Sequence, residues 1–234
     1  MKIIAGILLS MLFILNSCGL TGGETIPPQA GIYIINESPD APGVNVSINN
    51  NVLANNFTYG KDSGYFLLQP ATYNFKISLT GSSIDSTNEL LNIPAGKYYS
   101  LLFIDSLSRL KTLFIQDIFA QENTGYANIR FFDFSPNSPN IKTIFANKDT
   151  SAATDTVLVL SRYFNDQGTS SGYTKFTPVI PGTYNFSIYK TDSTAALIEN
   201  FGDTAFAAGK YYTIYLRGIY GNASTPLNIK IITH

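Results

Sequence analysis

The pentapeptide Ala-Gly-Lys-Tyr-Tyr occurs twice in this chain, at residues 95–99 and at residues 208–212. It belongs to a longer internal correspondence. Three landmarks recur in the same order, namely Ser38 with Ser135, Tyr73 with Tyr184, and Lys97 with Lys210. Ordered recurrence of this kind indicates a duplication. The chain is therefore expected to fold as two copies of one unit.

The two copies differ in length. The matched residues are 97 apart at the first landmark (135 − 38) and 111 apart at the second (184 − 73). The second copy thus has 14 additional residues (111 − 97) between these landmarks. We place most of them in residues 148–174, where the composition of residues 165–172 predicts a long polar loop.

Within each copy the side chains alternate between apolar and polar. This pattern holds in residues 44–48, 73–79, 184–188 and 227–231. Such alternation predicts strands with one buried face, so that Phe75 should point inward. The runs that follow the two pentapeptides are apolar on both faces, as in a central sandwich strand. Residues 87–93 are the best candidate for a helix outside the N-terminal segment.

Turn signals separate these strands. The pentapeptide itself predicts a tight turn feeding an aromatic strand, because glycine adopts positive φ at no steric cost. Short strands with turns about every ten residues predict an all-β chain of two tandem immunoglobulin-like or prealbumin-like β-sandwich domains. We place these domains at residues 31–119 and 125–234. The linker at 120–124 should restrict their relative motion without fixing their angle.

The N-terminal segment predicts export. Residues 3–15 form an apolar run of 13 residues (15 − 3 + 1) after Lys2. This run is too short for a membrane-spanning helix, which needs about 20 residues, and is typical of a secretory signal peptide. The following Leu-Asn-Ser-Cys at 15–18 resembles the lipobox of bacterial lipoproteins, which implies acylation of Cys18 and cleavage before it. The alternatives are a signal peptide with a chance cysteine and an uncleaved anchor.

We therefore expect a signal peptide at residues 1–17 and a lipidated flexible tether at 18–30. Cys18 is the only cysteine and has no disulfide partner within the chain. Because one acyl chain binds a membrane only marginally, stable anchoring needs two or more, as bacterial lipoproteins carry. The predicted location is the bacterial cell envelope. Gly19, in place of an aspartate that retains some lipoproteins in the inner membrane, favours the outer membrane.

Charge gives no reason to expect a nucleic-acid partner. Without the signal peptide, 14 basic residues (15 − 1) face 16 acidic ones. Charged residues make up 13% of the chain, against about 25% in typical proteins. A surface this close to neutral does not attract a polyanion.

Four segments of the first copy resemble a known family. They are SPDAPGVNV (38–46), Tyr59-Gly60, LQPATYNFKI (68–77) and IPAGKYYSLL (93–102). They resemble the bacterial family called domain of unknown function 4397, whose members are secreted or envelope β-domains, often in tandem. The resemblance implies fold and location and no activity. The second copy departs from the pattern at residues 135–139, where SPNSP lacks the equivalent of Asp40.

The residue types present exclude several kinds of catalysis. The only histidine is His234, at a chain end that we expect to fray, and the only cysteine is the lipidation candidate. Ser-His-Asp and Cys-His catalysis and the usual zinc sites are therefore not expected. Asp40 and nearby carbonyl groups offer oxygen ligands for calcium, but without a regular acidic loop. We predict no enzyme, no cofactor and no metal; a glycosidase-like pair of carboxylates stays open.

Aspartate is often followed by serine or threonine. Five such pairs carry a third residue that completes a triplet resembling the O-glycosylation signal of exported proteins in the Bacteroidota. The hydroxyl residues concerned are Ser86, Ser106, Thr156, Ser193 and Thr204. One hypothesis is that they carry glycans on exposed loops. The other is that these pairs simply form tight turns.

Three functions remain open. The first is a non-catalytic envelope lipoprotein for display, adhesion or scaffolding, with a protein or glycan partner. It would bind through end loops such as Pro39, Asp40 and Pro42 and residues 165–172. The second is a carbohydrate-binding accessory of polysaccharide uptake, which needs a coplanar set of exposed aromatic rings. The third is a carboxylate-only hydrolase, which needs two acids in one cleft.

Overall fold

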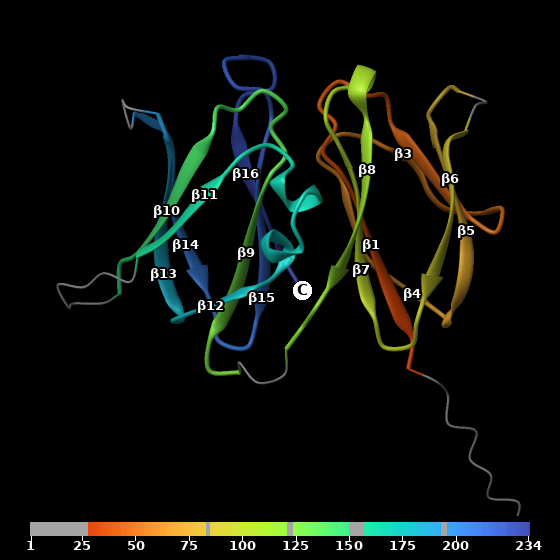
Figure 1. The fold of residues 1–234 in the computed structure, drawn as a ribbon, viewed down its shortest axis with the longest axis horizontal. Coiled ribbons are helices and arrows are strands. Elements are labelled where there is room, and N and C mark those ends of the chain that lie inside the picture. Colours follow the sequence, from red (N-terminus) through yellow and green to blue (C-terminus); the bar gives the residue numbers. More distant parts are fainter. Residues whose placement is uncertain (1–27, 83–84, 121–123, 150–156, 193–195) are drawn as a thin grey trace, which may run out of the picture.

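The computed structural model describes residues 28–82, 85–120, 124–149, 157–192 and 196–234 (Figure 1). These residues form sixteen β-strands and three single 3₁₀ turns. The predicted all-β class is confirmed. Residues 87–93, the helix candidate, lie instead in a strand that pairs along its length with a neighbour. No helix in the described part of the chain is long and apolar enough to cross a membrane.

The first half folds into two four-stranded sheets that pack face to face. Its strands are β1 (Ala30–Asn36), β2 (Val44–Ile48), β3 (Asn51–Phe57), β4 (Asp62–Leu68), β5 (Ala71–Leu79), β6 (Asp85–Ile93), β7 (Tyr98–Ile104) and β8 (Lys111–Asp117), with the 3₁₀ turn η1 (Leu107–Arg109) before β8. The sheet orders are β4-β1-β7-β8 and β3-β2-β5-β6. We call this half the first sandwich.

The second half repeats this topology. Its strands are β9 (Ala127–Asp133), β10 (Ile141–Asn147), β11 (Val157–Arg162), β12 (Thr177–Val179), β13 (Gly182–Lys190), β14 (Leu197–Phe206), β15 (Tyr211–Arg217) and β16 (Asn228–Thr233). The orders β12-β9-β15-β16 and β11-β10-β13-β14 match those of the first half with every strand shifted by eight. Each half also has one parallel pair, β1 with β7 and β9 with β15. We call this half the second sandwich.

Four sheets are stacked side by side in the molecule (Figure 1). The sheets containing β1 and β9 are the inner ones, and they pack against each other. Their contact is a hydrophobic cluster drawn from both sandwiches, comprising Tyr33, Ile35, Leu102, Ile104 and Ile115 of the first and Phe132, Phe134, Tyr215 and Ile232 of the second. We call this contact the seam.

The seam explains why the runs after the pentapeptides are apolar on both faces. Every residue of β1 and of β9 is buried, and β7 and β15 are buried over most of their length. One face of each inner sheet packs against its own outer sheet, and the other packs against the opposite sandwich. In an ordinary antiparallel sandwich, one face of each strand is exposed to solvent. Packing between the sandwiches therefore requires the second apolar face.

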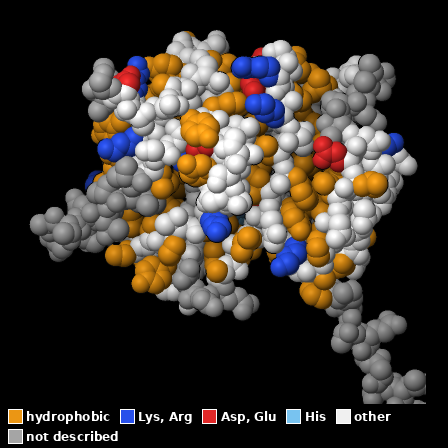
Figure 2. Space-filling model, in the orientation of Figure 1, with side chains coloured by type: hydrophobic (Ala, Val, Ile, Leu, Met, Phe, Trp, Pro, Cys, Tyr) orange, Lys and Arg blue, Asp and Glu red, His pale blue; other side chains and the backbone are white. Residues whose placement is uncertain are grey.

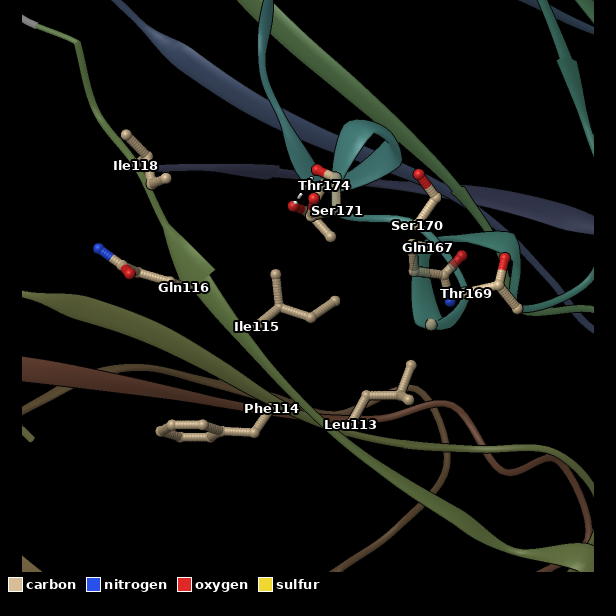
Figure 3. A pocket seen from close by; sticks show the side chains of 11 residues that line it. Leu113, Phe114, Ile115, Gln116, Ile118, Gln167, Thr169, Ser170, Ser171 and Thr174 are labelled. Atoms are coloured by element: carbon tan, nitrogen blue, oxygen red, sulfur yellow. Dashed lines mark hydrogen bonds between the residues drawn. The ribbon is translucent and has the colours of Figure 1, made fainter. Parts of the chain in front are cut away.

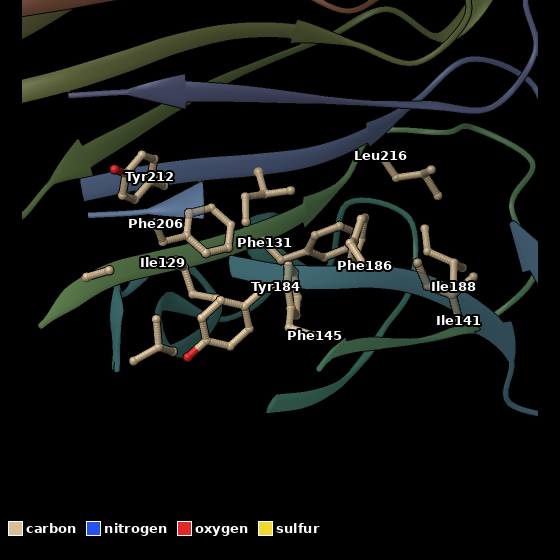
Figure 4. Close-up of a cluster of buried hydrophobic side chains, with 13 residues drawn as sticks. Ile129, Phe131, Ile141, Phe145, Tyr184, Phe186, Ile188, Phe206, Tyr212 and Leu216 are labelled. Carbon is tan, nitrogen blue, oxygen red and sulfur yellow. The ribbon is translucent and has the colours of Figure 1, made fainter. Parts of the chain in front are cut away.

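The outer sheets follow the alternation seen in the sequence. Phe75 and Phe186, separated by the repeat spacing of 111, are both buried in the cores of their own sandwiches. In the second core, Phe186 stacks on Phe145 with ring centroids 4.5 Å apart (Figure 4). The inward orientation predicted for Phe75 is confirmed.

The pentapeptide forms the predicted turn. Gly96 and Gly209 have φ of 67° and 72°, a conformation that favours glycine. After each turn the first tyrosine packs against the ring of Phe119, and the second lies over its own sandwich core. Tyr99, for example, stacks on Phe114 at 4.6 Å.

Core truncation tests the orientation of the outer strands. Phe75→Ala removes a side chain that is 1% exposed, and we expect the free energy of unfolding to fall by about 3–5 kcal/mol. Val52→Ala, in the same sheet but 72% exposed, should change it by no more than about 0.5 kcal/mol. Urea denaturation of both variants measures the difference. Equal effects would show that the face assignment is wrong.

Candidate functional site

The two sandwiches differ most in one connection. In the first sandwich residues 58–61 join β3 to β4, whereas in the second residues 163–176 join β11 to β12. We call residues 163–176 the insert. It contains the 3₁₀ turns η2 (Asp166–Gly168) and η3 (Ser171–Thr174). The additional length expected within residues 148–174 therefore lies at least partly here.

The long polar loop predicted at residues 165–172 lies within the insert, and its residues 168–172 are exposed, but the insert is also anchored by buried groups. Asp166 is fully buried. Its carboxylate accepts hydrogen bonds from Arg162 Nε and Nη2, at 2.7 and 2.6 Å. The Arg162 guanidinium also lies 4.6 Å from the ring centre of Tyr173. A charge-assisted bidentate pair of this kind holds two groups in one geometry. The pair thus fastens the insert to the end of β11.

The insert takes the place of most of a strand. β12 has three residues, whereas its counterpart β4 has seven. The edge of β9 beyond β12 is covered by the insert, through Asn165 N–H donating to Asp133 O (3.0 Å) and Arg130 Nη1 donating to Thr174 O (3.3 Å). These bonds satisfy backbone carbonyls that would otherwise lack a partner strand.

A groove of about 460 Å³ separates the insert from β8 of the first sandwich (Figure 3). One wall is β8 with the residue after it, and the other is the insert. Its lining is Leu113, Phe114, Ile115, Gln116, Ile118, Gln167, Gly168, Thr169, Ser170, Ser171 and Thr174. None of these side chains is charged. Because both sandwiches build this groove, we take it as the candidate binding site.

One polar group in the groove is unsatisfied. Gln167 is buried, and its Nε2 donates to Asn165 Oδ1 at 3.1 Å. Its Oε1 has no hydrogen-bond partner among the described residues. An unpaired buried acceptor of this kind costs about 1–3 kcal/mol.

At the opposite edge of the seam the sandwiches meet closely. The Tyr59-Gly60 turn is the short counterpart of the insert, and Gly60 O accepts from Lys230 Nζ at 2.8 Å. Lys230 also pairs with Asp62. Gly60 has φ of +79°, and a Cβ there would lie 2.7 Å from Arg217 Nη1. The positive φ favours glycine at this approach between the two halves.

Glu37 lies buried in the seam near this edge. Its nearest cation is Arg217, with Nη1 3.6 Å from Oε1, and neither carboxylate oxygen has a hydrogen-bond partner among the described residues. Burial raises the pKa of Glu37 to about 7, although the Arg217 charge acts in the other direction. The carboxyl of the folded protein is therefore mostly protonated below about pH 7.

A buried ion pair joins the sandwiches elsewhere in the seam. Asp117 Oδ1 and Arg130 Nη2 are 2.6 Å apart, and both side chains are buried. Tyr65 and Ser100 donate to Asp117 at 2.7 and 2.9 Å. Arg130 Nε donates to Thr213 at 2.8 Å. Complete hydrogen bonding of this kind compensates the loss of hydration of both charges.

His234 does not fray as the sequence suggested. Its ring nitrogens lie 2.9 Å from Tyr65 Oη and 2.7 Å from Thr213 Oγ1. Because Tyr65 donates to Asp117 and Thr213 accepts from Arg130, a neutral ring satisfies every partner. Burial lowers the pKa of His234 to about 4, with the Arg130 charge acting in the same direction. Thr213 is 1% exposed, whereas His234 and Tyr65 are half-buried.

The loop residues predicted as a contact surface have a structural role in part. Asp40 is exposed, and its Oδ1 accepts from Leu107 N–H at 2.7 Å. In the second sandwich the equivalent residue is Asn137, whose Oδ1 accepts a hydrogen bond from Tyr220 N–H at 2.8 Å. The Asp-to-Asn difference between the copies therefore preserves the acceptor. Pro39 is half-buried and Pro42 exposed, and none of these loop residues lines the groove.

The candidate glycosylation residues do not all lie on loops. Thr204 is half-buried within β14, and Ser86 lies within β6, so the loop placement expected for these two is wrong. Ser106 is in a turn, and its N–H donates to Asp105 Oδ1 at 2.7 Å, in accord with turn chemistry. Thr156, Ser193 and Cys18 lie outside the described residues.

Other features of the described residues bear on the open functions. No ring pair joins the most exposed tyrosines, which are Tyr126, Tyr163, Tyr173 and Tyr220, to one another. No group of three or more potential metal ligands occurs in the described segments. Two further cavities, of about 320 and 200 Å³, contain one acidic residue between them, Glu199. Charged side chains are sparse on the face in Figure 2.

The buried carboxyl of Glu37 predicts a pH dependence. Its folded pKa of about 7 exceeds the ordinary 4.5, so its contribution to stability is complete below about pH 4.5 and lost as the pH rises through 7. Glu37→Gln should therefore exceed the wild type in stability at pH 8 by about 3 kcal/mol, and match it near pH 4. Denaturation across this range tests the shift, with Glu89→Gln on the exposed surface as control. Parallel curves for wild type and Glu37→Gln would contradict it.

The Arg162–Asp166 pair predicts how firmly the insert is held. Asp166→Asn keeps the shape but leaves the buried Arg162 charge without its partner, which should destabilise the protein by about 3–5 kcal/mol. Lys148→Ala, which breaks an exposed pair with Asp203, should leave the denaturation midpoint nearly unchanged. A small effect of Asp166→Asn would show that the insert is held by other contacts.

Comparison with known proteins identifies part of the chain. No curated protein matches it. The family model described as Domain of unknown function (DUF4397) matches residues 30–144. This span contains β1 to β8 and continues through β9 into β10, so it extends past the first sandwich into the second. The description assigns no activity. The match places residues 30–144 in the DUF4397 domain family.

Proposed function

We propose that this chain is a non-catalytic, lipid-anchored protein of the bacterial cell envelope that presents two β-sandwiches as one rigid binding or scaffold module. The observation that carries the proposal is the burial of both faces of the inner sheets. Separating the sandwiches would expose the apolar seam to water, at a cost of about 25 cal/mol per Å². A module held in this way keeps its binding surfaces in fixed positions.

The anchoring part of the proposal is supported by the N-terminal sequence. The apolar run at 3–15 and the Leu-Asn-Ser-Cys at 15–18 fit a lipoprotein signal, and Gly19 favours the outer membrane. The first strand of the described residues, β1, begins at Ala30. Residues between Cys18 and this strand would then form the tether.

The non-catalytic part is supported by the surroundings of the reactive groups. The Thr213, His234, Tyr65 and Asp117 groups are hydrogen-bonded to one another, and Asp117 is also paired with the buried Arg130. The groove has no acidic or basic side chain. General acid–base catalysis requires such a group within reach of the substrate.

The proposed contact surface is the groove between β8 and the insert. Both walls are parts of one rigid body, so little order has to be gained when a ligand binds. A carbohydrate-binding role is the second candidate, favoured by the hydroxyl and amide groups of the lining. Against it, the one aromatic residue of the lining, Phe114, stacks on Tyr99 in the first core.

Lipid anchoring is tested by labelling. With an alkyne analogue of palmitate supplied to cells, the wild-type protein should incorporate the label and Cys18→Ala should not. Thr21→Ala, a change within the tether, is the matched control and should be labelled normally. Labelled Cys18→Ala, or an unlabelled wild-type protein that retains its first 17 residues, would contradict the anchor.

A further inference from the structure

We propose that the groove binds an extended, uncharged peptide segment, which pairs with the free edge of β8 as an added strand. This inference rests on the proposed binding function and names the class of ligand. Strand addition supplies affinity through main-chain hydrogen bonds and selectivity through alternate side chains. The argument depends on the edge strand, on the wall opposite it and on the charge of the lining.

β8 is the least protected edge of the inner sheets. It is the last strand of its sheet, and its seven residues pair with β7 without a register shift. Between Lys111 and Asp117 it carries no charge and no proline. Its outer edge therefore offers a regular row of backbone donors and acceptors.

The other three edges of the inner sheets each carry a protective device. β4 contains an irregularity in its pairing with β1 and has Gly64 at φ +71°. β12 has three residues, one of which is Pro178. β16 carries Lys230 at its centre. Bulges, short strands, proline and lysine are the usual means by which edge strands avoid pairing with another chain. β8 has no bulge and no proline, it is seven residues long, and its single lysine, Lys111, stands at its first position, outside the residues that line the groove.

The groove follows this edge. Residues 113–116 line it consecutively, although successive side chains of a strand point to opposite faces. Leu113 and Ile115 pack in the seam, whereas Phe114 packs in the first core. A cavity that reaches all of them must lie beside the strand and not over one face.

The insert forms the second wall without occupying the edge. Among the described residues no hydrogen bond joins β8 to the insert. The space between them is about 460 Å³ (Figure 3). The insert would admit a single added strand and block a further one. This arrangement explains how an unprotected edge is tolerated without aggregation.

The lining selects the chemistry of the peptide. The wall opposite β8 carries the hydroxyl groups of Thr169, Ser170, Ser171 and Thr174. They can bond polar, uncharged side chains on one face of an added strand. A charged side chain would lose hydration there without an opposite charge. A glycan would instead need an exposed aromatic ring, which the lining lacks.

The test begins with selection of a ligand. The full mature protein in detergent is used to select from a phage library of random linear 12-residue peptides, and the best synthetic peptide is measured by fluorescence anisotropy. We expect an uncharged central stretch in the selected sequences. Ser171→Arg should weaken binding at least tenfold by filling the groove, whereas Ser224→Arg, on the β15–β16 loop, should not.

Backbone methylation distinguishes strand addition from other modes. In a β-ladder, only alternate residues of the added strand point their N–H groups at β8. N-methylation at alternate positions should therefore lower affinity about tenfold, and methylation between them should have little effect. Binding should also slow amide hydrogen exchange in β8. Melting temperatures of the variants confirm that each is folded.

Three results would overturn the proposal. They are selection of no peptide, equal binding by wild type and Ser171→Arg, and methylation effects without alternation. Glycan binding that is lost in Ser171→Arg, with no peptide selected, would also overturn it while preserving the groove as a binding site. Failure of the proposed envelope function appears separately, in the labelling of Cys18.

Discussion

The rest of the structure depends on the burial of both faces of the two inner sheets. A sheet with two apolar faces is insoluble on its own and needs a covering layer on each side. The outer sheets supply one layer, and the opposite sandwich supplies the other. The seam is therefore a part of the core shared by both halves, with Phe132 and Tyr215 as deeply buried as the residues of either sandwich. Rigidity of the module follows from this shared core.

The seam also shows how a duplicated unit pairs with itself. Asp117 of the first sandwich meets Arg130 of the second. The positions equivalent by the repeat spacings are Lys230 (117 + 113) and Tyr33 (130 − 97), and both bind Asp62. Equivalent positions of the two copies thus face each other on both sides of the seam, directly in one case and through Asp62 in the other.

The departure from this symmetry creates the candidate site. On one side of the seam the Tyr59-Gly60 turn meets the second sandwich through ion pairs and a cation–π contact, whereas on the other the longer insert leaves a groove. The buried Arg162–Asp166 pair shows that the insert has a fixed structure. Close packing of the two sandwiches would not by itself produce an open groove, so the groove needs another explanation, such as binding.

The sequence predicted the elements better than their arrangement. Alternation around Phe75 and the turn before Tyr98 gave the right strands, because both depend on neighbouring residues. The seam was not predicted, because an apolar run on both faces does not say what covers the second face. The loop at residues 165–172 was predicted, but its buried anchor was not, since the pairing of Asp166 with Arg162 cannot be read from a polar composition. His234 was misjudged since its partners are far away in the sequence.

Native-state hydrogen exchange on the full chain tests the shared core most directly. If the seam makes the sandwiches one cooperative unit, the slowest amides of β1, β7, β9 and β15 should all open with the same free energy, that of global unfolding. A plateau for one sandwich well below that of the other would show that the halves open independently, and would contradict the account.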